Sequence, residues 1–449
     1  MRMSSGMHQS VNISMSQAKL RDGSRKKFPG TVIKMRRWIG RAVAFLIMLG
    51  LSEAQESFQL RDGDRVVFDG DSITEPRLYT TFVETYAVTR FPDLRLTFVD
   101  SAWGGDRVTG GRGGPIDLRL QRDVISQNPT VLAIMLGIND GRGVPYDPRL
   151  FNIFATGYEH IVNVVRDALP GIRITLMQPS PYDEVTRPPA FEGGYNGVLL
   201  RYGTFVKELG GRKGLTVADL NAPLVAVLEK AQKADPALAK RIAGDGTHPG
   251  LAGHLILAES LLKAWNATAI VSLVEIDAAR KRVVHAVNTS VTRVRTIRGL
   301  SWMEKDKALP FPLDSNDPAM AMAARCSDVV QALDQQTLKV TGLPGAHYRL
   351  KIDGEQIAVF GREQLEEGVN LALLDTPMKK QATRVHALTR KRNEVQFGRW
   401  RQVQVALQND SLPHKQAALD ALANLEQGLL QEQRAAAQPK ARRYQLVRQ

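Results

Sequence analysis

The sequence predicts an α/β fold in which helices cover both faces of a parallel sheet. From residue 65 to about residue 267, short apolar segments alternate with longer segments whose apolar residues recur at helical spacing. The short segments are rich in Val, Ile and Leu at successive positions, which is typical of strands buried on both faces. Such strands, separated by helices, indicate three layers with the sheet in the middle.

Each element of this region has its own pattern. Five apolar runs are predicted as strands, at residues 65–69, 94–100, 130–137, 172–178 and 215–220. Four longer segments with apolar residues three and four positions apart are predicted as helices, at residues 79–91, 151–169, 195–209 and 251–265. In sheets of this kind, functional side chains gather beyond the carboxyl ends of the strands.

After about residue 267 the pattern changes. Residues 340–360 are predicted as short strands, with a tight hairpin turn at Asp353-Gly354. Residues 414–437 have the spacing of an amphipathic helix. The proline-containing segment 300–318 is expected to be irregular. We therefore expect an α+β accessory region. Its sequence is compatible both with recognition of a ligand and with packing against the region of residues 65–267.

The amino-terminal residues have the pattern of a secretory signal peptide. Basic side chains between residues 34 and 41 precede the apolar run 42–51, which is too short to cross a bilayer as a mature helix. Ser52 and Ala54 then fit the two cleavage-site positions. A short buried helix is the alternative, but it explains neither the basic flank nor the small residues. We expect an exported protein, periplasmic or extracellular, with no membrane span after cleavage.

Composition narrows the possible partners. The net charge is +14, but the segment from Met1 to Ala54 holds ten Lys and Arg against two acidic side chains, so more than half of the surplus lies in the leader. The charge is thus no argument for nucleic-acid binding. Cys326 is the only cysteine, so no intramolecular disulfide can form. Without paired cysteines, and with few histidines, no metal site is expected. The oligomeric state is left open.

Five polar or small residues are predicted to meet at one edge of the sheet. Ser72 follows the first strand, Gly105 the second and Asn139 the third, while Asp245 and His248 precede the last helix. Each also has a plainer explanation, as a helix cap, a turn residue or a capping-box variant. Because four separate loops would converge at the carboxyl edge of the sheet, a shared site is the better explanation.

The loop after the first strand is compatible with two types of reaction, in which either an aspartate or a serine is the nucleophile. Asp69 and Asp71 form an Asp-x-Asp sequence that resembles the opening of haloacid-dehalogenase phosphatases, in which one carboxylate attacks phosphorus and magnesium neutralises charge. That interpretation leaves His248 and Asn139 without a role. A serine nucleophile uses both, and Asp69 and Asp71 are then structural.

Four short sequence motifs together resemble those of a second enzyme family. The sequences FDGDSIT (68–74), SAWGGD (101–106), GIND (137–140) and DGTH (245–248) occur in this order. Together they resemble the blocks of the SGNH hydrolases, also called the GDSL esterase/lipase family. The resemblance covers roughly residues 64–267. It implies a flavodoxin-like three-layer catalytic domain.

The resemblance also implies a role for each residue. Ser72 would be the nucleophile, and Asp245 and His248 would complete the catalytic triad. The backbone N–H groups of Ser72 and Gly105 and the amide of Asn139 would form the oxyanion hole. The chemistry agrees, because a serine hydroxyl needs an imidazole to accept its proton and an oriented carboxylate to fix that imidazole. No cofactor is needed.

The second block departs from the family pattern. Asp100 and Ala102 stand where the family has Asn and a first Gly. Near this loop, Trp103 is a candidate for lining the substrate cleft. Tyr182 and Tyr195, in the irregular stretch after the fourth strand, are candidates for its rim.

The sequence thus predicts three regions: an extension and signal peptide at residues 1–54, a catalytic domain at 55–267 and an accessory region at 268–449. The expected function is hydrolysis of carboxylic esters, with acyl groups on carbohydrates or short-chain esters as substrates. The alternatives are a magnesium-dependent phosphatase of the haloacid dehalogenase type and a non-catalytic glycan-binding surface protein.

Overall fold

The computed structural model describes residues 57–296 and 299–449. Its first part is built on a five-stranded sheet of order β2-β1-β5-β6-β7, and every neighbouring pair is parallel. The strands are β1 (Arg65–Gly70), β2 (Thr97–Asp100), β5 (Val131–Met135), β6 (Arg173–Met177) and β7 (Thr216–Ala218). Each overlaps one predicted strand, so the predicted parallel sheet is confirmed.

Both faces of the sheet are covered. All five residues of β5 are buried, although successive side chains of a strand point to opposite faces. The main helices of this part are α2 (Leu78–Arg90), α4 (Pro148–Ala168), α5 (Gly194–Lys213), α6 (Ala222–Ala234), α7 (Pro236–Ala243) and α8 (Leu251–Ala264). Tyr158 of α4 donates a hydrogen bond to the carbonyl of Ile134 in β5 at 3.0 Å. Tyr79 of α2 stacks on His254 of α8, so α2 and α8 form one covering pair.

Short elements follow β2. They are β3 (Gly110–Gly111), β4 (Gly114–Pro115), α3 (Ile116–Arg119), η1 (Leu120–Val124) and η2 (Ile125–Gln127). This segment returns the chain to the start of β5.

Two further sheets follow α8. The four-stranded sheet contains β15 (Val369–Asn370), β12 (Gln335–Thr341), β8 (Ile270–Asp277) and β9 (Arg282–Val287), in that order. The antiparallel five-stranded sheet contains β10 (Thr289–Arg295), β11 (Leu300–Asp306), β16 (Arg442–Arg448), β13 (His347–Ile352) and β14 (Glu355–Gly361). Short helices connect them: α9 (Pro318–Cys326), α10 (Val329–Leu333), α11 (Arg362–Glu367) and η3 (Leu371–Leu373).

The predictions for this part are confirmed in two places and wrong in one. Asp353 and Gly354 both have positive φ, 52° and 88°, and join β13 to β14 as the predicted hairpin turn. The helix predicted at 414–437 is α13 (Lys415–Ala437). Segment 300–318 is not irregular throughout, because residues 300–306 form β11. Its side chains alternate between buried and more exposed, and its backbone pairs with β10 and β16, which the prolines later in the segment do not prevent.

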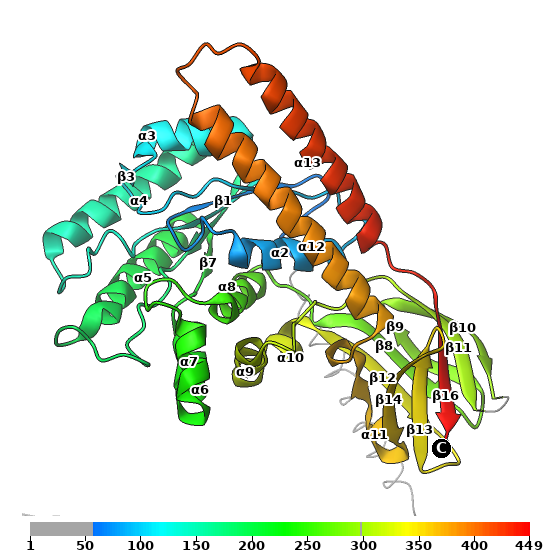
Figure 1. Cartoon of the computed structure of the whole chain (residues 1–449). Helices are drawn as coiled ribbons and strands as arrows, with labels where there is room; N and C mark the ends of the chain where they lie inside the picture. Colours follow the sequence, from blue (N-terminus) through cyan, green and yellow to red (C-terminus); the bar gives the residue numbers. More distant parts are fainter. Residues whose placement is uncertain (1–56, 297–298) are drawn as a thin grey trace, which may run out of the picture. The chain divides into compact units, whose positions relative to one another are not determined.

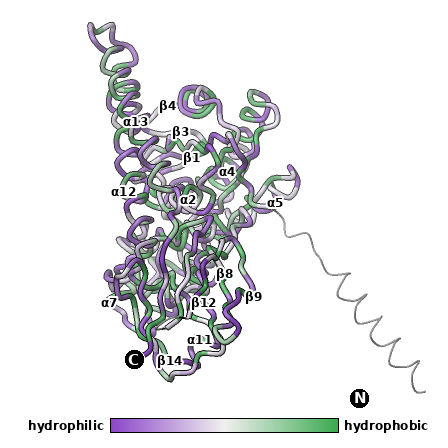
Figure 2. Tube along the Cα trace, turned by 90° about the vertical axis from the view of Figure 1, so that its right-hand side faces the viewer, coloured by the Kyte–Doolittle hydropathy of each residue, from purple (hydrophilic) through white to green (hydrophobic). Residues whose placement is uncertain are grey.

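The last long helices return to the first part of the chain. Figure 1 shows α12 (Pro377–Phe397) and α13 side by side, with α12 crossing α2. Hydrophilic and hydrophobic residues alternate along both helices, as expected for helices with one face against the protein (Figure 2). Between them lies the π-helical segment η4 (Gly398–Val405).

A buried ion pair fixes α12 to α2. Arg392 donates to Glu84 at 2.7 Å, and the two side chains are 1% and 2% exposed. Gln433 of α13 donates to the other oxygen of Glu84, and Asn393 donates to Thr81. The accessory region therefore braces the helix that directly follows the Ser72 loop.

No helix in the described residues is long and apolar enough to span a membrane. The predicted signal peptide lies outside these residues. Cys326 is a free thiol and is buried.

Replacing Arg392 with Ala should destabilise the fold by about 3–5 kcal/mol, because the carboxylate of Glu84 would stay buried without its cation. Urea unfolding followed by tryptophan fluorescence measures this change. Arg95→Ala is the control, since Arg95 pairs with Asp62 at the surface and its removal should leave the unfolding midpoint nearly unchanged. Equal midpoints for the two variants would contradict the bracing role.

Candidate active site

The loop after β1 presents Ser72 at the carboxyl edge of the sheet. The N–H of Ile73 donates to Asp71 Oδ1 at 2.9 Å, and the N–H of Thr74 donates to the carbonyl of Asp71 at 3.1 Å. A Cβ added to Gly70 would stand only 2.6 Å from Thr74 Oγ1, so the tight turn requires glycine there. The result is a short, internally bonded turn with the hydroxyl of Ser72 at its tip.

His248 and Asp245 lie on the loop between α7 and α8. Asp245 Oδ1 accepts the N–H groups of Thr247 at 2.9 Å and of His248 at 2.7 Å. Its Oδ2 lies 2.8 Å from His248 Nδ1. With an ionised Asp245, Nδ1 carries the proton, which leaves Nε2 as an acceptor. Because Nε2 is 2.8 Å from Ser72 Oγ, the hydroxyl donates to it.

Asp245 is well suited to remain ionised. Its partial burial raises the pKa, but hydrogen bonds from the backbone and ring of His248 and from the N–H of Thr247 offset this effect. The net result is a pKa below the ordinary value. The carboxylate can therefore stabilise a positive charge on the imidazole.

The loop after β2 lies against Ser72. A Cβ built on Gly104 would be in ordinary contact with Ser72 Cβ, at 3.6 Å, and would lie 2.7 Å from Glu75 Oε2, so Gly104 lies directly beside the Ser72 loop. Gly105 has φ of +82°, in the left-handed region that glycine adopts without strain. Gly105 thus lets the chain turn sharply beside the hydroxyl.

Asn139 joins the loops after β2 and β5. Its Nδ2 donates to the carbonyl of Asp106 at 3.1 Å. A second hydrogen bond joins the same two loops: the N–H of Val108 donates to Asp140 Oδ1 at 3.0 Å. An amide nitrogen carries two hydrogens, so Asn139 keeps one donor beyond the bond to Asp106. The structure thus brings Ser72, His248 and Asp245 together and ties the loops that carry Gly105 and Asn139.

Asp100, which stands where the family pattern has Asn, is buried. Asp100 Oδ1 accepts the N–H of Ala102 at 3.2 Å, and Oδ2 accepts the hydroxyl of Thr80 at 3.3 Å. Burial raises the pKa of Asp100 to about 7. Near neutral pH a large share of this carboxyl is therefore uncharged, as the amide of an asparagine would be.

A cavity of about 630 Å³ adjoins the site. It is lined by Arg107, Ile138, Asn139, Arg142, Gly143, Tyr182, Ala190, Phe191, Tyr195 and Thr247. Tyr182 and Tyr195 are among its lining residues, with their rings edge to face at 5.6 Å. Tyr195 also donates its hydroxyl to the carbonyl of Ile138, which fixes it beside Asn139.

Trp103 has a different position from the one expected. It is 8% exposed and is not among the residues that line this cavity. Its ring packs edge to face on Trp400 at 6.0 Å, and the guanidinium of Arg401 lies over it. No local pattern predicted these partners, because they come from η4, which is far from Trp103 in the sequence. Trp103 therefore packs the loop against the accessory region.

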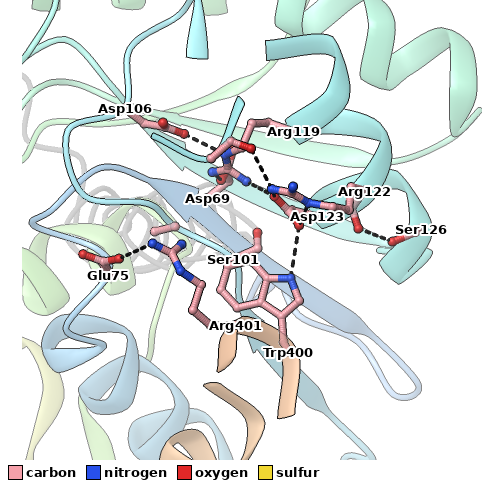
Figure 3. Close-up of polar contacts among 12 residues, drawn as sticks. Asp69, Glu75, Ser101, Asp106, Arg119, Arg122, Asp123, Ser126, Trp400 and Arg401 are labelled. Atoms are coloured by element: carbon pink, nitrogen blue, oxygen red, sulfur yellow. Dashed lines mark hydrogen bonds and ion pairs between the residues drawn. The ribbon is translucent and has the colours of Figure 1, made fainter. Parts of the chain in front are cut away.

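The residues that the sequence analysis missed lie beneath these loops. Figure 3 shows Arg119 between three aspartates, donating to Asp69 at 2.9 Å, to Asp106 at 2.8 Å and to Asp123. Trp400 donates its indole N–H to Asp123 at 3.1 Å. A hint was present in the sequence, since several aspartates at the ends of buried strands favour a buried cation nearby.

Arg119 also bears on the phosphatase alternative. Asp69, which would be the attacking carboxylate, is 2% exposed and accepts a hydrogen bond from Arg119. Burial raises the pKa of Asp69 to about 6, and Arg119 opposes that rise. Within residues 57–296 and 299–449, no group of three or more His, Cys, Asp or Glu is arranged to hold a metal ion. The geometry thus favours a structural role for Asp69.

The comparisons agree with this geometry. Residues 68–256 match the model of the GDSL-like Lipase/Acylhydrolase family. The region of residues 68–256 therefore has the sequence pattern of this family. The chain is accordingly a carboxylic ester hydrolase of the GDSL type. An acetylxylan esterase from Geobacillus stearothermophilus is 25% identical over 225 residues, which cover 46% of this chain and 95% of that protein.

Solved structures also resemble the chain. A gut microbial diltiazem-metabolizing enzyme has a TM-score of 0.76 and 26% identity, covering 88% of this chain and all of that one. Its similarity extends beyond the GDSL region, so the accessory region has a structural counterpart there. The structure of an acetylxylan esterase from Geobacillus stearothermophilus covers 46% of this chain and 96% of that one, with 24% identity and a TM-score of 0.37.

Asp71 provides a pH test of this site. Burial raises its pKa to about 7, against about 3.9 in an unfolded chain. Between these values the folded state holds a proton that the unfolded state lacks, so this group's contribution to the free energy of unfolding falls as pH rises toward 7. Asp71→Asn removes the titration. Its unfolding free energy relative to wild type should therefore increase by about 2–3 kcal/mol from pH 5 to pH 8.

Urea unfolding of both proteins at the two pH values measures this difference. Asp147→Asn is the control, because Arg149 holds the pKa of Asp147 below its ordinary value and the carboxylate is ionised in both states throughout this range. A constant difference between Asp71→Asn and wild type would show that Asp71 is already ionised at pH 5.

Proposed function

We propose that this GDSL-family esterase is an exported enzyme that removes short acyl groups, acetyl foremost, from carbohydrates. The hydrogen-bonded series Ser72, His248 and Asp245, with both contacts at 2.8 Å, carries the catalytic part of the proposal. The 25% identity to an acetylxylan esterase over nearly all of that protein supports the substrate class. Aromatic side chains in the cavity, which can stack on sugar rings, support it further.

The first half-reaction begins at Ser72. His248 Nε2 accepts the hydroxyl proton as Oγ attacks the ester carbonyl, and Asp245 stabilises the imidazolium that forms. Collapse of the tetrahedral intermediate breaks the bond to the alcohol oxygen. The imidazolium returns its proton to that oxygen, so the sugar leaves as a neutral alcohol and an acyl-serine remains.

Negative charge on the carbonyl oxygen needs donors already in place. In this proposal they are the backbone N–H groups of Ser72 and Gly105 and the free hydrogen of the Asn139 amide. The bond from Asn139 to Asp106 holds that amide in a fixed orientation before substrate arrives. Donors fixed in advance stabilise the transition state without reorganising.

The second half-reaction uses the same groups. A water molecule gives a proton to His248 Nε2 and attacks the acyl carbonyl. Collapse of the second intermediate breaks the bond to Ser72 Oγ, which recovers the proton from the imidazolium. The acid is released and the enzyme is restored.

The catalytic assignment is tested with 4-nitrophenyl acetate and acetylated xylan. Ser72→Ala should abolish turnover and labelling by a serine-directed organophosphonate, and a chelator should leave wild-type turnover unchanged. Asn139→Ala should keep the labelling and lower kcat on the order of 100- to 1000-fold. Turnover of 4-nitrophenyl phosphate that persists in Ser72→Ala and is inhibited by the chelator would favour the phosphatase alternative. A correctly folded wild type that is not labelled would favour the glycan-binding alternative.

Export rests on the basic flank, the apolar run 42–51 and the small residues before the expected cleavage after Ala54. The full-length chain, expressed in a host with a secretory pathway, should be recovered outside the cytoplasm with residue 55 at its amino terminus. Amino-terminal sequencing of the recovered protein measures this. Retention of the uncut chain in the cytoplasm would contradict it.

A further inference from the structure

The cavity beside Ser72 contains two arginines that form no ion pair with any described residue. Arg107 and Arg142 both line it together with Asn139. In the part of the chain that the structure describes, neither guanidinium makes a hydrogen bond or an ion pair, and no acidic residue lines this cavity. The cavity therefore presents two guanidinium groups whose donors are open to its contents.

Other arginines of this part of the chain are paired. Arg119, Arg149 and Arg187 each form an ion pair with a carboxylate. Guanidinium groups on a protein surface readily find such partners, because their planar donors match a carboxylate. Two that are left open in one cavity are available to a ligand.

The backbone holds both arginines close to the reacting groups. Arg107 directly follows Asp106, whose carbonyl accepts the Asn139 amide. Arg142 has φ of +57°, which is uncommon for a residue with a long side chain, and its N–H donates to the carbonyl of Asn139 at 3.3 Å. Both side chains therefore start within a few residues of the proposed oxyanion donors.

A third cation adds to the positive field. The Nε of Arg112 lies 4.0 Å from the point where a Cβ on Gly105 would stand. The nearest buried carboxyl is Asp140, whose pKa burial raises to about 7, while the N–H of Val108 and the charge of Arg107 oppose that rise. An anion placed here would meet more positive than negative charge.

We propose that the preferred substrate carries a carboxylate close to the scissile ester, as in an acetylated uronic acid unit of an acidic polysaccharide, bound by Arg107 and Arg142. This inference rests on the proposed function and narrows its substrate class. The aromatic side chains Tyr182 and Phe191 in the same cavity suit the face of the sugar ring, while the guanidinium groups suit its carboxylate.

The test compares three sugars that differ only at C6. They are the methyl glycosides of 3-O-acetyl-glucuronic acid, of its C6 methyl ester and of 3-O-acetyl-glucose, with released acetate as the readout. The wild type should favour the carboxylate over both neutral sugars by about 10- to 100-fold in kcat/KM, as expected for a charge-assisted guanidinium contact. The preference should shrink at 0.5 M NaCl, because salt screens an open site.

Arg107→Gln and Arg142→Gln should each reduce the ratio between carboxylate and neutral sugars toward one. Arg149→Gln is the matched control, an exposed arginine already paired with Asp147, and should keep the wild-type ratio. A wild type that hydrolyses all three sugars equally would overturn this inference and leave the esterase proposal standing. Turnover that persists in Ser72→Ala would overturn the esterase proposal instead.

A fourth substrate separates the two places where the carboxylate could sit. The hemisuccinate ester of methyl glucoside carries its charge on the acyl group. A preference for this compound over acetylated glucuronic acid would place the carboxylate on the acyl side and overturn the uronic acid assignment. A preference for the glucuronic acid would support it.

Discussion

The guanidinium of Arg119 is the interaction on which the site depends. It lies beneath three loops and donates to Asp69 at the end of β1, to Asp106 after Gly105 and to Asp123 in η1. Each of these side chains is at most 3% exposed, so without Arg119 three carboxyl groups would be buried with far less compensation. One cation thus fixes the loop that carries Ser72 relative to the loop that carries Gly105.

The accessory region continues this support from outside. Trp400 donates to Asp123 and packs on Trp103, while Arg401 covers Trp103 and lies 3.4 Å from Glu75. A Cβ on Gly104 would meet that same Glu75, so Arg401 acts on a residue that faces the glycine loop. The loop after β2 is thus held from below by Arg119 and from the side by η4. This makes the accessory region part of the structure that shapes the active site.

Burial and charge divide the site into two environments. The supporting aspartates are buried, and burial raises the pKa of Asp71, Asp100 and Asp140 to about 7. Asp245 lies at the half-open edge, where its hydrogen bonds hold its pKa low. A single residue type therefore gives three buried carboxyl groups with raised pKa values and a stable carboxylate next to the imidazole. All of these groups are aspartates, so their different burial and hydrogen bonds account for their different pKa values.

The sequence by itself determined the parallel sheet, its five strands and the loops that carry Ser72, Gly105, Asn139, Asp245 and His248. These follow from local patterns, because buried strands are continuous apolar runs and functional groups collect at their carboxyl ends. The roles assigned to those five residues remain predictions that the activity tests decide.

Only the tertiary structure decided which residues support that edge and which face the cavity. Trp400 and Arg401 reach the site through contacts between segments that are far apart in the sequence, and no local pattern signals such contacts. The same separation explains why Trp103 is buried under η4 when the loop sequence suggested a place in the cleft. It also explains why β11 was not predicted as a strand, because its partner β16 is the last strand of the chain. Local apolar patterns specify elements, but the pairing of distant charges and strands depends on the folded chain as a whole.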